Sequence, residues 1–365
     1  MFSKNAWWVI VALLLALPAL ARDAAPPRGT VVDEPFVSTV LRDNRIGLNP
    51  ERVIKLLLPP GYAKSKQRYP VVYFLHNAWW GPRQMVEDGR AQRLIERAFA
   101  DGVVQDFIFV VADYTGPTTG SLYENSPVSG RWIDYTVDEV VPLIDRKYRT
   151  IARRESRAVV GDFFGGRGAL KLAMVKADVF GVAYAMHPVA TGAGDIPWAS
   201  LEVDWPRIHS AKTFGELSGL GRTQIFWAIH QAFAPNVAAP PCFCDFYTEM
   251  KNGKAAYNPD RVMAMQKAFL LDETLAESAP ALRTMRGLAL DWGRFDTTQA
   301  HVSSNRQFSR KLEDLGIEHE AEEYRGDPFN RTWTEDGRFA KRVLPFLAKY
   351  LGYSDPPGMT ADRSR

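Results

Sequence analysis

One short segment restricts the fold of this chain more than any other. Residues 157–170 read RAVVGDFFGGRGAL, in which the apolar run Ala158–Gly161 leads into a Gly-x-x-x-Gly-Gly pattern and then into residues of helical character. A short, continuously apolar run predicts a strand that is buried on both faces. Closely spaced glycines allow a strand and a helix to approach each other. The segment therefore predicts a strand, a tight turn and a helix.

The chain from residue 50 onward alternates such strands with helices. Short apolar or β-branched runs predict strands at Val53–Leu58, Val71–Leu75, Phe107–Ala112, Val182–Met186, Leu288–Trp292 and Ile317–Tyr324. Apolar residues at helical spacing predict helices at 132–146, at 168–175, before Gly316 and at 338–351. This alternation is typical of an α/β fold, with a mostly parallel central sheet and helices on both faces.

The alternation breaks between residues 190 and 285, where prolines and tryptophans gather. We predict a largely helical insertion there, over one edge of the sheet and its cleft, rather than a separate domain. A single α/β domain then spans residues 35–352. Residues 22–34, which are rich in proline, are expected to be a flexible lead-in, and residues 353–365 a tail.

The composition excludes several classes of protein. Hydrophobic residues make up 46% of the 365 positions and charged residues 24%, so the chain is neither disordered nor fibrous. A net charge of +3 over this length indicates no nucleic-acid-binding patch. The two cysteines, Cys242 and Cys244, are too few for a disulfide framework or a structural metal site, and we interpret them as a loop pair. We expect no cofactor and no metal.

The first 21 residues, MFSKNAWWVIVALLLALPALA, resemble a targeting signal. Lys4 is their one charged side chain, and the uncharged run Ala6–Ala21 has 16 residues, fewer than the roughly 20 that a membrane-spanning helix needs. The run ends in Ala-Leu-Ala, a small-x-small pattern for signal peptidase. We predict a cleaved export signal, a periplasmic or secreted protein in which Cys242 and Cys244 can oxidise, and no membrane span after cleavage. An uncleaved membrane anchor is the alternative.

Segment 157–170 also has the form of a nucleophile elbow. This strand–turn–helix displays a catalytic serine at the centre of Gly-x-Ser-x-Gly. The flanking glycines, Gly161 and Gly165, are in place. The centre of the motif, however, is Phe163.

At these residues the chain resembles the putative-esterase branch of the α/β-hydrolase fold, which includes enterochelin esterases, feruloyl esterases, S-formylglutathione hydrolases and mycolyltransferases. The elbow of that family usually reads RAI-A-G-H-S-M-G-G-x-G-A-L. The resemblance covers roughly residues 35–350 and continues in LPPGY at 58–62, YPVVYFLH at 69–76, DEVVPLID at 138–145, DWGRFD at 291–296 and LPF at 344–346. It implies the α/β-hydrolase fold.

The resemblance assigns the three positions of a Ser–His–Asp triad, and two of them have changed. The serine position holds Phe163, the histidine position holds Pro328, and the acid position is kept as Asp296. The chemistry needs a hydroxyl that attacks and an imidazole that takes and returns its proton. A phenyl ring cannot attack a carbonyl group, and a prolyl nitrogen in a peptide cannot accept a proton at neutral pH.

The surroundings of the triad are partly kept. The elbow frame comprises Gly161, Asp162, Phe164, Gly165 and Gly166. The resemblance implies an oxyanion loop at His76, Asn77 and Ala78, where the family typically has His-Gly-Gly. Backbone N–H donors can survive such substitutions. Trp79 and Trp80 follow, and they would either narrow the mouth of the cleft or pack under the insertion.

Four other residues offer partial substitutes for the missing groups. Asp162 adjoins the elbow centre, but an aspartate nucleophile belongs at the centre itself. The resemblance implies that His76 holds its loop. His301 lies five residues after Asp296, at a family histidine position outside the triad. His187 follows a predicted strand, where it would either face the pocket or form a structural hydrogen bond.

The motifs of the fold are kept, but two of the three reacting groups are missing. Together with the export signal, this predicts an exported pseudo-esterase. Its cleft, partly filled by Phe163, would bind a small ester-like or glycan-linked ligand, or a sister esterase. One alternative is an active carboxylic ester hydrolase with an atypical nucleophile, for which the serines near the cleft are Ser121, Ser126 and Ser129. Another is an envelope scaffold without a ligand. Neither Phe163→Ser nor Pro328→His alone is expected to restore hydrolysis, because triad residues act as a unit.

Overall fold

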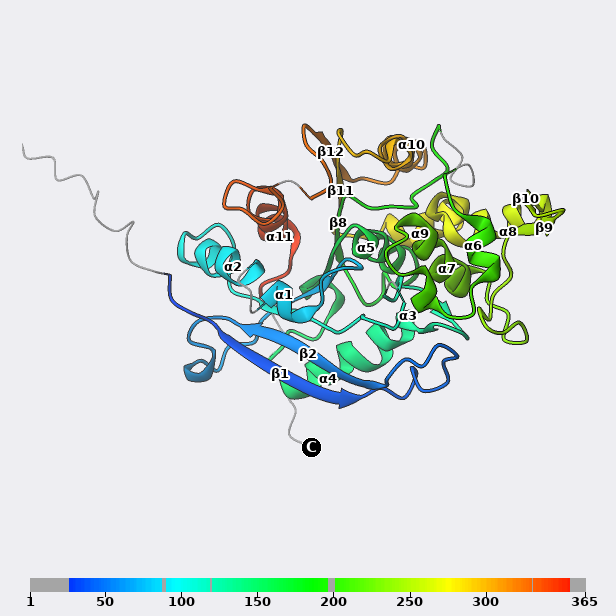
Figure 1. Cartoon of the computed structure of the whole chain (residues 1–365). Coiled ribbons are helices and arrows are strands. Elements are labelled where there is room, and N and C mark those ends of the chain that lie inside the picture. Colours follow the sequence, from blue (N-terminus) through cyan, green and yellow to red (C-terminus); the bar gives the residue numbers. More distant parts are fainter. Residues whose placement is uncertain (1–25, 87–89, 119, 196–200, 330, 355–365) are drawn as a thin grey trace, which may run out of the picture.

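An eight-stranded sheet runs through the middle of the molecule and carries helices on both faces (Figure 1). The computed structural model describes residues 26–86, 90–118, 120–195, 201–329 and 331–354. The strands follow the order β1 (Thr30–Val37), β2 (Glu51–Leu58), β4 (Ile108–Val111), β3 (Val71–Leu75), β7 (Arg157–Asp162), β8 (Val182–Met186), β11 (Gly287–Gly293) and β12 (Glu320–Tyr324). The pairs β1–β2 and β2–β4 are antiparallel and the others parallel, so the predicted mostly parallel sheet is confirmed.

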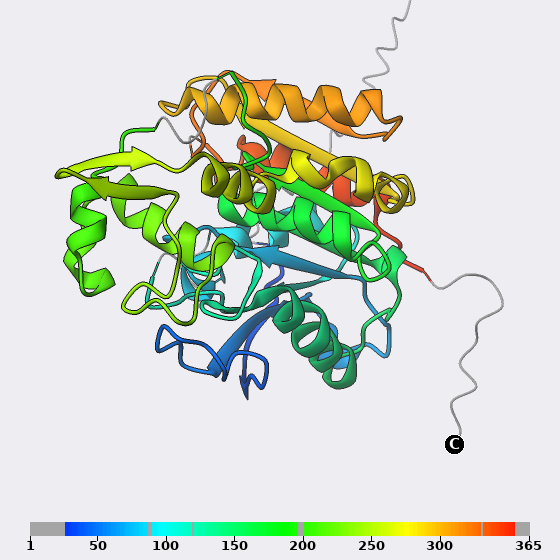
Figure 2. The same ribbon diagram turned by 90° about the vertical axis from the view of Figure 1, so that its right-hand side faces the viewer.

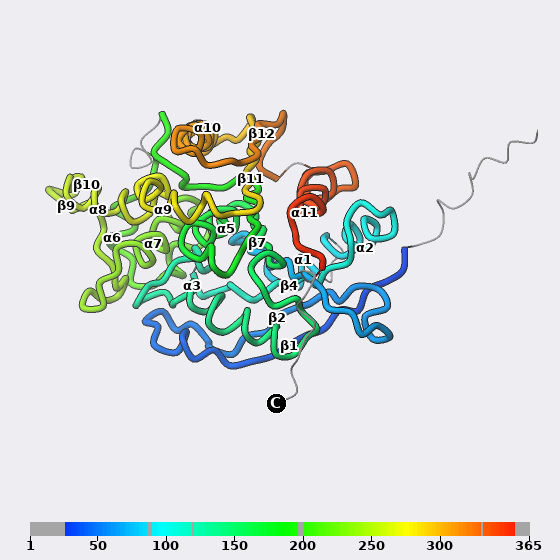
Figure 3. Tube along the Cα trace, turned by 180° about the vertical axis from the view of Figure 1, so that it is seen from behind, coloured from blue at the N-terminus to red at the C-terminus, as the bar shows by residue number. Residues whose placement is uncertain are grey.

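Alternate side chains of the interior strands enter two separate cores. In β3, Tyr73 and Leu75 face one core, and Val72 and Phe74 face the other. The second core is covered by α1 (Pro82–Val86), α2 (Ala91–Ala100), the π-helical turn η7 (Phe339–Val343) and α11 (Leu344–Tyr350). The first is covered by α3 (Trp132–Asp134), the π-helical η2 (Tyr135–Val140), α4 (Val141–Lys147), α5 (Phe164–Val175), α9 (Leu275–Leu282) and α10 (Gln299–Asp314). Figure 3 shows α2 and α11 together on the side opposite α5 and α9.

The predicted insertion lies between β8 and β11, and it gathers on one side of the molecule in Figures 1 and 2. Its regular elements are α6 (Trp205–Ser210), η5 (Phe214–Leu217), α7 (Arg222–Phe233), β9 (Thr248–Lys251), β10 (Lys254–Tyr257), α8 (Pro259–Phe269), η6 (Leu271–Thr274) and α9. The hairpin β9–β10 was not predicted. Cys242 and Cys244 form a disulfide in a loop of the insertion. The remaining short elements of the chain are η1 (Tyr62–Lys64), β5 (Asn125–Ser126), β6 (Gly130–Arg131) and η3 (Arg154–Ser156).

Two boundaries differ from the sequence-based expectation. Strand β1 occupies residues 30–34 of the predicted flexible lead-in, so that expectation was wrong for these residues. This edge strand alternates polar and half-buried residues, and its full pairing with β2, from Thr30 opposite Leu58 to Val37 opposite Glu51, holds it in place. Helix α5 begins at Phe164 rather than at residue 168, because packing imposes helix on the poor helix formers Gly165 and Gly166.

The predicted export signal at 1–21 and most of the tail at 353–365 lie outside the described residues. Among the residues that are described, no helix is both long and apolar enough to cross a membrane.

A buried arginine ties the insertion to the elbow helix. Arg167 on α5 is 1% exposed and donates from Nη2 to the backbone oxygen of Phe269, at 2.8 Å. Its Nη1 reaches the backbone oxygen of Leu122 at 3.4 Å, and its guanidinium lies 4.7 Å from the ring centre of Phe233. Glu124 lies 3.6 Å from Nη2 and supplies the opposite charge. The cation therefore connects α5, α7 and the end of α8.

We expect Arg167→Met to lower the free energy of unfolding by about 2–4 kcal/mol, because it leaves the buried carbonyl groups of Leu122 and Phe269 without the donor that Arg167 supplies. Lys171→Met is the matched control, since Lys171 pairs with the same Glu124 at 3.2 Å but does not contact the carbonyl groups that Arg167 binds. In the Lys171→Met variant the free energy of unfolding should fall by less than about 1 kcal/mol. Urea unfolding of both variants measures the difference, and equal losses would contradict an anchoring role for Arg167.

Candidate functional site

The turn between β7 and α5 keeps the strained backbone of a nucleophile elbow. Phe163 has φ 58° and ψ −107°, a conformation that bulky side chains rarely adopt. Its N–H donates to the backbone oxygen of Met186 on β8 at 3.0 Å, and its own oxygen accepts from the N–H of Arg167 at 3.0 Å. The surrounding structure thus fixes the turn although no serine stands at its centre.

Two glycines make this turn possible. A Cβ atom on Gly161 would lie 1.9 Å from the backbone oxygen of Gly165. A Cβ atom on Gly165 would lie 1.9 Å from the backbone oxygen of Leu75, at the end of β3. Any side chain at either position would force the helix away from the sheet.

The Asp296 carboxylate, just after β11, is shared by two histidines. Its Oδ2 lies 2.9 Å from Nε2 of His187 and 2.7 Å from Nδ1 of His301, and its Oδ1 accepts from the N–H of Thr298 at 2.7 Å. Burial alone would raise the pKa of Asp296, but the hydrogen bonds from the two imidazoles and Thr298 hold it well below its usual range. Asp296 is therefore an ionised acceptor at the edge of the cleft.

The hydrogen bonds set different roles for the two imidazoles. The N–H of Gly293 donates to Nδ1 of His187 at 2.9 Å, so the proton of the neutral ring lies on Nε2 and is directed at Asp296. Burial lowers the pKa of His187, despite the hydrogen bond with Asp296, and favours this neutral form. His301 instead faces Asp296 with Nδ1, which leaves Nε2 as its acceptor. An aspartate on Nδ1 with Nε2 available is the arrangement of a general base in a Ser–His–Asp triad.

The same three side chains could in principle hold a metal ion, since one ligand atom of each lies within 4.8 Å of the others. These atoms are already joined by hydrogen bonds. A metal on Nε2 of His187 would have to displace the proton that the Gly293 contact places there. The arrangement therefore fits a hydrogen-bonded acid–base pair better than a metal centre.

Aromatic rings fill the space where a nucleophile would meet its base. The ring of Phe163 stacks on His187 with a centroid separation of 6.0 Å and meets His301 edge-on at 5.5 Å. It also contacts Trp79 at 5.5 Å and Phe329 at 5.3 Å. Trp79 is 54% exposed, so it lies at the rim of the cleft rather than under the insertion.

Position 328 lies in the loop that completes this aromatic cluster. Pro328 is buried, and the next residue, Phe329, touches Phe163. Asp296 binds His187 and His301, and the rings of both histidines contact the ring of Phe163. The structure therefore brings positions 163 and 296 and the 328–329 loop to one place.

The side chain of Asn77 binds backbone N–H groups next to the loop where the oxyanion donors are expected. Its Oδ1 accepts from the N–H groups of Trp79 at 2.9 Å and Trp80 at 3.0 Å. Two backbone donors that follow β3 are therefore already bound. His76 lies beneath this loop, with Nδ1 2.8 Å from the oxygen of Asn77 and Nε2 accepting from the N–H of Tyr114. Both of its nitrogens serve the fold. Ala78 is half-buried in the same loop.

Asp162 lies behind the elbow and away from the cleft. It is 1% exposed, accepts from Nδ2 of Asn77 at 3.1 Å and leaves its buried Oδ1 without a partner. Burial raises the pKa of Asp162 to about 7, although the hydrogen bond from Asn77 opposes the rise. A carboxyl group that is enclosed and keeps its proton below about pH 7 is a poor nucleophile, and Asp162 serves the structure of the turn.

The three serines proposed as alternative nucleophiles have no base beside them among the described residues. Ser126 donates to the backbone oxygen of Gln231 at 2.7 Å, and Ser121 accepts from the N–H of Tyr123. The buried hydroxyl of Ser129 has no hydrogen-bond partner. None of the three lines the cavity in front of Phe163.

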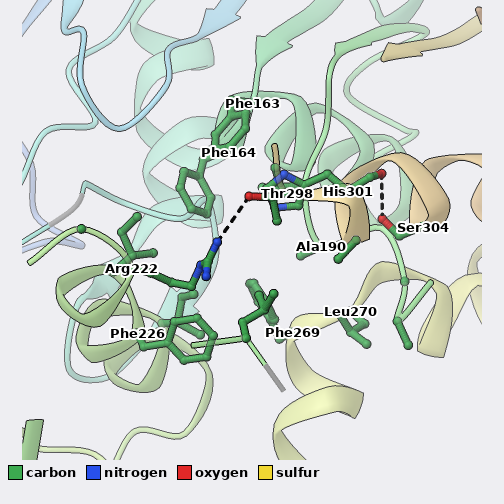
Figure 4. A pocket seen from close by; sticks show the side chains of 18 of the residues that line it. Phe163, Phe164, Ala190, Arg222, Phe226, Phe269, Leu270, Thr298, His301 and Ser304 are labelled. Carbon is green, nitrogen blue, oxygen red and sulfur yellow. Dashed lines mark hydrogen bonds between the residues drawn. The ribbon is translucent and has the colours of Figure 1, made fainter. Parts of the chain in front are cut away.

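That cavity, of about 290 Å³, opens between the elbow and the insertion (Figure 4). Phe163, Phe164 and Trp79 form one wall, and apolar residues of α7 and the end of α8 form the other. Its polar lining includes Arg222 and His301. Sequence reasoning missed Arg222 because no motif surrounds it, and it treated His301 as peripheral because only the fold shows which ring nitrogen faces Asp296.

Comparisons with known proteins agree with this architecture. Residues 47–336 match the model of a family described as "Putative esterase". An endo-1,4-beta-xylanase/feruloyl esterase of Xylanibacter ruminicola is 28% identical over 135 residues, which are 34% of this chain and 18% of that protein. Esterase Rv1288 of Mycobacterium tuberculosis is 29% identical over 171 residues, which are 46% of this chain and 34% of that protein. The matches thus span only a fifth to a third of these relatives.

Solved structures show the same fold at low sequence identity. A ferulic acid esterase superposes with a TM-score of 0.60 and 18% identity, over 89% of this chain and 99% of that chain. An S-formylglutathione hydrolase from Agrobacterium tumefaciens superposes with a TM-score of 0.58 and 14% identity, over 89% and 97% of the two chains. The α/β-hydrolase fold expected from the sequence is confirmed.

The raised pKa of Asp162 predicts a pH-dependent stability. Between about pH 4 and pH 7 the unfolded chain has released this proton while the folded chain keeps it, so stability falls as the pH rises. Asp162→Asn can still accept from Asn77 and removes this titration. At about 1.4 kcal/mol for each tenfold difference in proton affinity, the variant should gain roughly 3 kcal/mol relative to the parent between pH 5 and pH 8. Denaturant unfolding at both pH values measures this gain, and Asp138→Asn, at an exposed position, should show none.

The position of His301 revises the expectation for Phe163→Ser. Because His301 already presents a base paired with Asp296, this single change should allow slow labelling by a serine-directed fluorophosphonate. His301→Gln in that background should reduce the labelling rate about a hundredfold, in the range of general-base effects. His187→Gln is the control and should have a smaller effect, since both ring nitrogens of His187 are bound. Equal labelling with and without His301, in folded protein, would contradict its assignment as the base.

Proposed function

The chain belongs to the "Putative esterase" family, and we propose that it is an exported, catalytically impaired member that uses the cleft of the fold to bind a ligand. The observation that carries the proposal is Phe163 at the centre of an elbow that keeps its strained backbone. The turn keeps the geometry that presents a nucleophile. It presents a phenyl ring instead.

The second support is the state of the oxyanion loop. Preorganised N–H donors account for a large part of acyl-transfer catalysis. Here the side chain of Asn77 binds the N–H groups of Trp79 and Trp80, which directly follow the expected oxyanion residues 76–78, so these two neighbouring donors could serve a tetrahedral intermediate only if the loop rearranged. The two changes, at the elbow and at the loop, disfavour the same reaction independently.

The third support is the cavity, which favours ligand binding over a purely structural role. Concave, mostly apolar sites with a few convergent polar groups are typical of small-molecule pockets. The cavity next to Phe163 has this character, with Arg222, Thr298 and His301 on its lining. Export is proposed from residues 1–21 alone. That a sister esterase occupies the cleft stays a prediction.

We expect the purified mature protein, residues 22–365, to hydrolyse short-chain aryl esters no faster than a matched Phe163→Ala variant and buffer. Loss of one triad member already removes several powers of ten from the rate. A chromogenic ester assay measures this, and labelling with a serine-directed fluorophosphonate provides an independent readout. Turnover that the phosphonate abolishes would overturn the proposal in favour of an active esterase with a nucleophile other than residue 163.

A further inference from the structure

We propose that the cavity beside Phe163 binds a small apolar monocarboxylate, whose carboxylate group pairs with Arg222. The inference rests on the proposed ligand-binding function and names the chemical class of the ligand. It follows from three properties of the cavity: its apolar walls, one cation on its lining, and the neighbouring carboxylate of Asp296, whose oxygens are already held by hydrogen-bond donors.

The walls of the cavity are built almost entirely from apolar side chains. Two aromatic residues of the elbow, Phe163 and Phe164, face residues of the insertion that include Ile225, Phe226, Ile229 and Leu270. Figure 4 shows Phe163 and Phe164 on one side of the open space, with Phe226, Phe269 and Leu270 across from them. A ligand gains about 25 cal/mol for each Å² of apolar surface that it buries there. The body of the ligand should therefore be hydrocarbon.

Arg222 supplies a cation on this apolar lining. It is the first residue of α7, is half-buried, and extends toward Thr298 in Figure 4. Its Nη2 lies 3.5 Å from Oγ1 of Thr298, at the limit of a hydrogen bond. Within the described part of the chain, no carboxylate forms an ion pair with Arg222. A guanidinium has five N–H donors and binds carboxylates through two parallel hydrogen bonds, so a ligand carboxylate fits this group.

The acid of the site does not oppose an anionic ligand strongly. Asp296 is bound by His187, His301 and the N–H of Thr298, so three donors already surround its charge. Asp272, behind the opposite wall, pairs with Lys311 at 2.5 Å. The polar end of the ligand then lies beside Arg222 and Thr298, with His301 on the same lining.

The volume of the cavity limits the size of the ligand. At roughly 30 Å³ for each water-sized group, a volume of about 290 Å³ accommodates about ten non-hydrogen atoms. Octanoate, a straight-chain acid, and 4-phenylbutanoate, an aromatic acid, both have approximately this size. Both carry one carboxylate on an apolar body. Their relative affinities distinguish a fatty acid from an aromatic acid as the class of ligand.

The test compares binding of octanoate, 4-phenylbutanoate and neutral octanol by isothermal titration calorimetry. We expect the parent protein to bind at least one acid more tightly than octanol. Arg222→Gln should weaken binding of that acid about 10- to 100-fold, as expected for the loss of hydrogen bonds to a charged group, and leave octanol binding nearly unchanged. Arg93→Gln, on the exposed side of α2, removes the same charge elsewhere and should change neither.

The outcomes separate this inference from the proposed function. If octanol binds as tightly as the acids and Arg222→Gln changes nothing, the cavity binds apolar ligands but the assignment of Arg222 is wrong. If an acid binds equally well to the Arg222→Gln and parent proteins, its carboxylate lies elsewhere and the inference is likewise overturned. If none of the three compounds binds the folded parent protein, both the inference and a ligand-binding function for this cavity fail.

Discussion

The close approach of helix α5 to the ends of β3 and β7 is the constraint on which the site depends. It requires the absence of a side chain at Gly161 and Gly165, where a Cβ atom would lie 1.9 Å from a backbone oxygen. This approach forces residue 163 into a positive φ and directs its side chain into the cleft. The stacking of Phe163 on His187, and its place on one wall of the cavity, follow from that direction.

A second feature of the site is that an acid–base pair, Asp296 and His301, lies beside Phe163, whose side chain has no proton to exchange. Asp296 holds one histidine by Nε2 and another by Nδ1, and only the second arrangement leaves a nitrogen for the cleft. The pair is also structural, because it links the loop after β8 to the start of α10. Its retention therefore does not by itself indicate catalysis. The proposal of a binding site rests instead on the residue at the elbow and on the bound N–H groups next to the expected oxyanion loop.

The sequence predicted the interior strands well, because strands such as β3 and β8 are buried on both faces and read as continuous apolar runs. It missed β1, an edge strand whose order comes from pairing with β2 rather than from its own residues. Family motifs placed Asp296 and the elbow. They could not reveal that His187, 109 residues from Asp296, shares its carboxylate, because that contact exists only once β8 and β11 pair in the sheet. Nor could they reveal that Arg222 faces the elbow, because that arrangement exists only after the insertion folds over the sheet.

The position of Trp79 gives the molecule an internal optical reporter. Its indole ring lines the cavity and touches Phe163, yet it is 54% exposed, whereas Trp132, Trp205, Trp227, Trp292 and Trp333 are buried. Emission from a water-facing indole lies at longer wavelengths than emission from buried ones and is accessible to iodide quenching. A molecule that enters the cavity would displace water from this ring in particular. Occupancy of the cleft should therefore be visible in the native chain as a blue-shifted, less quenchable component of its fluorescence.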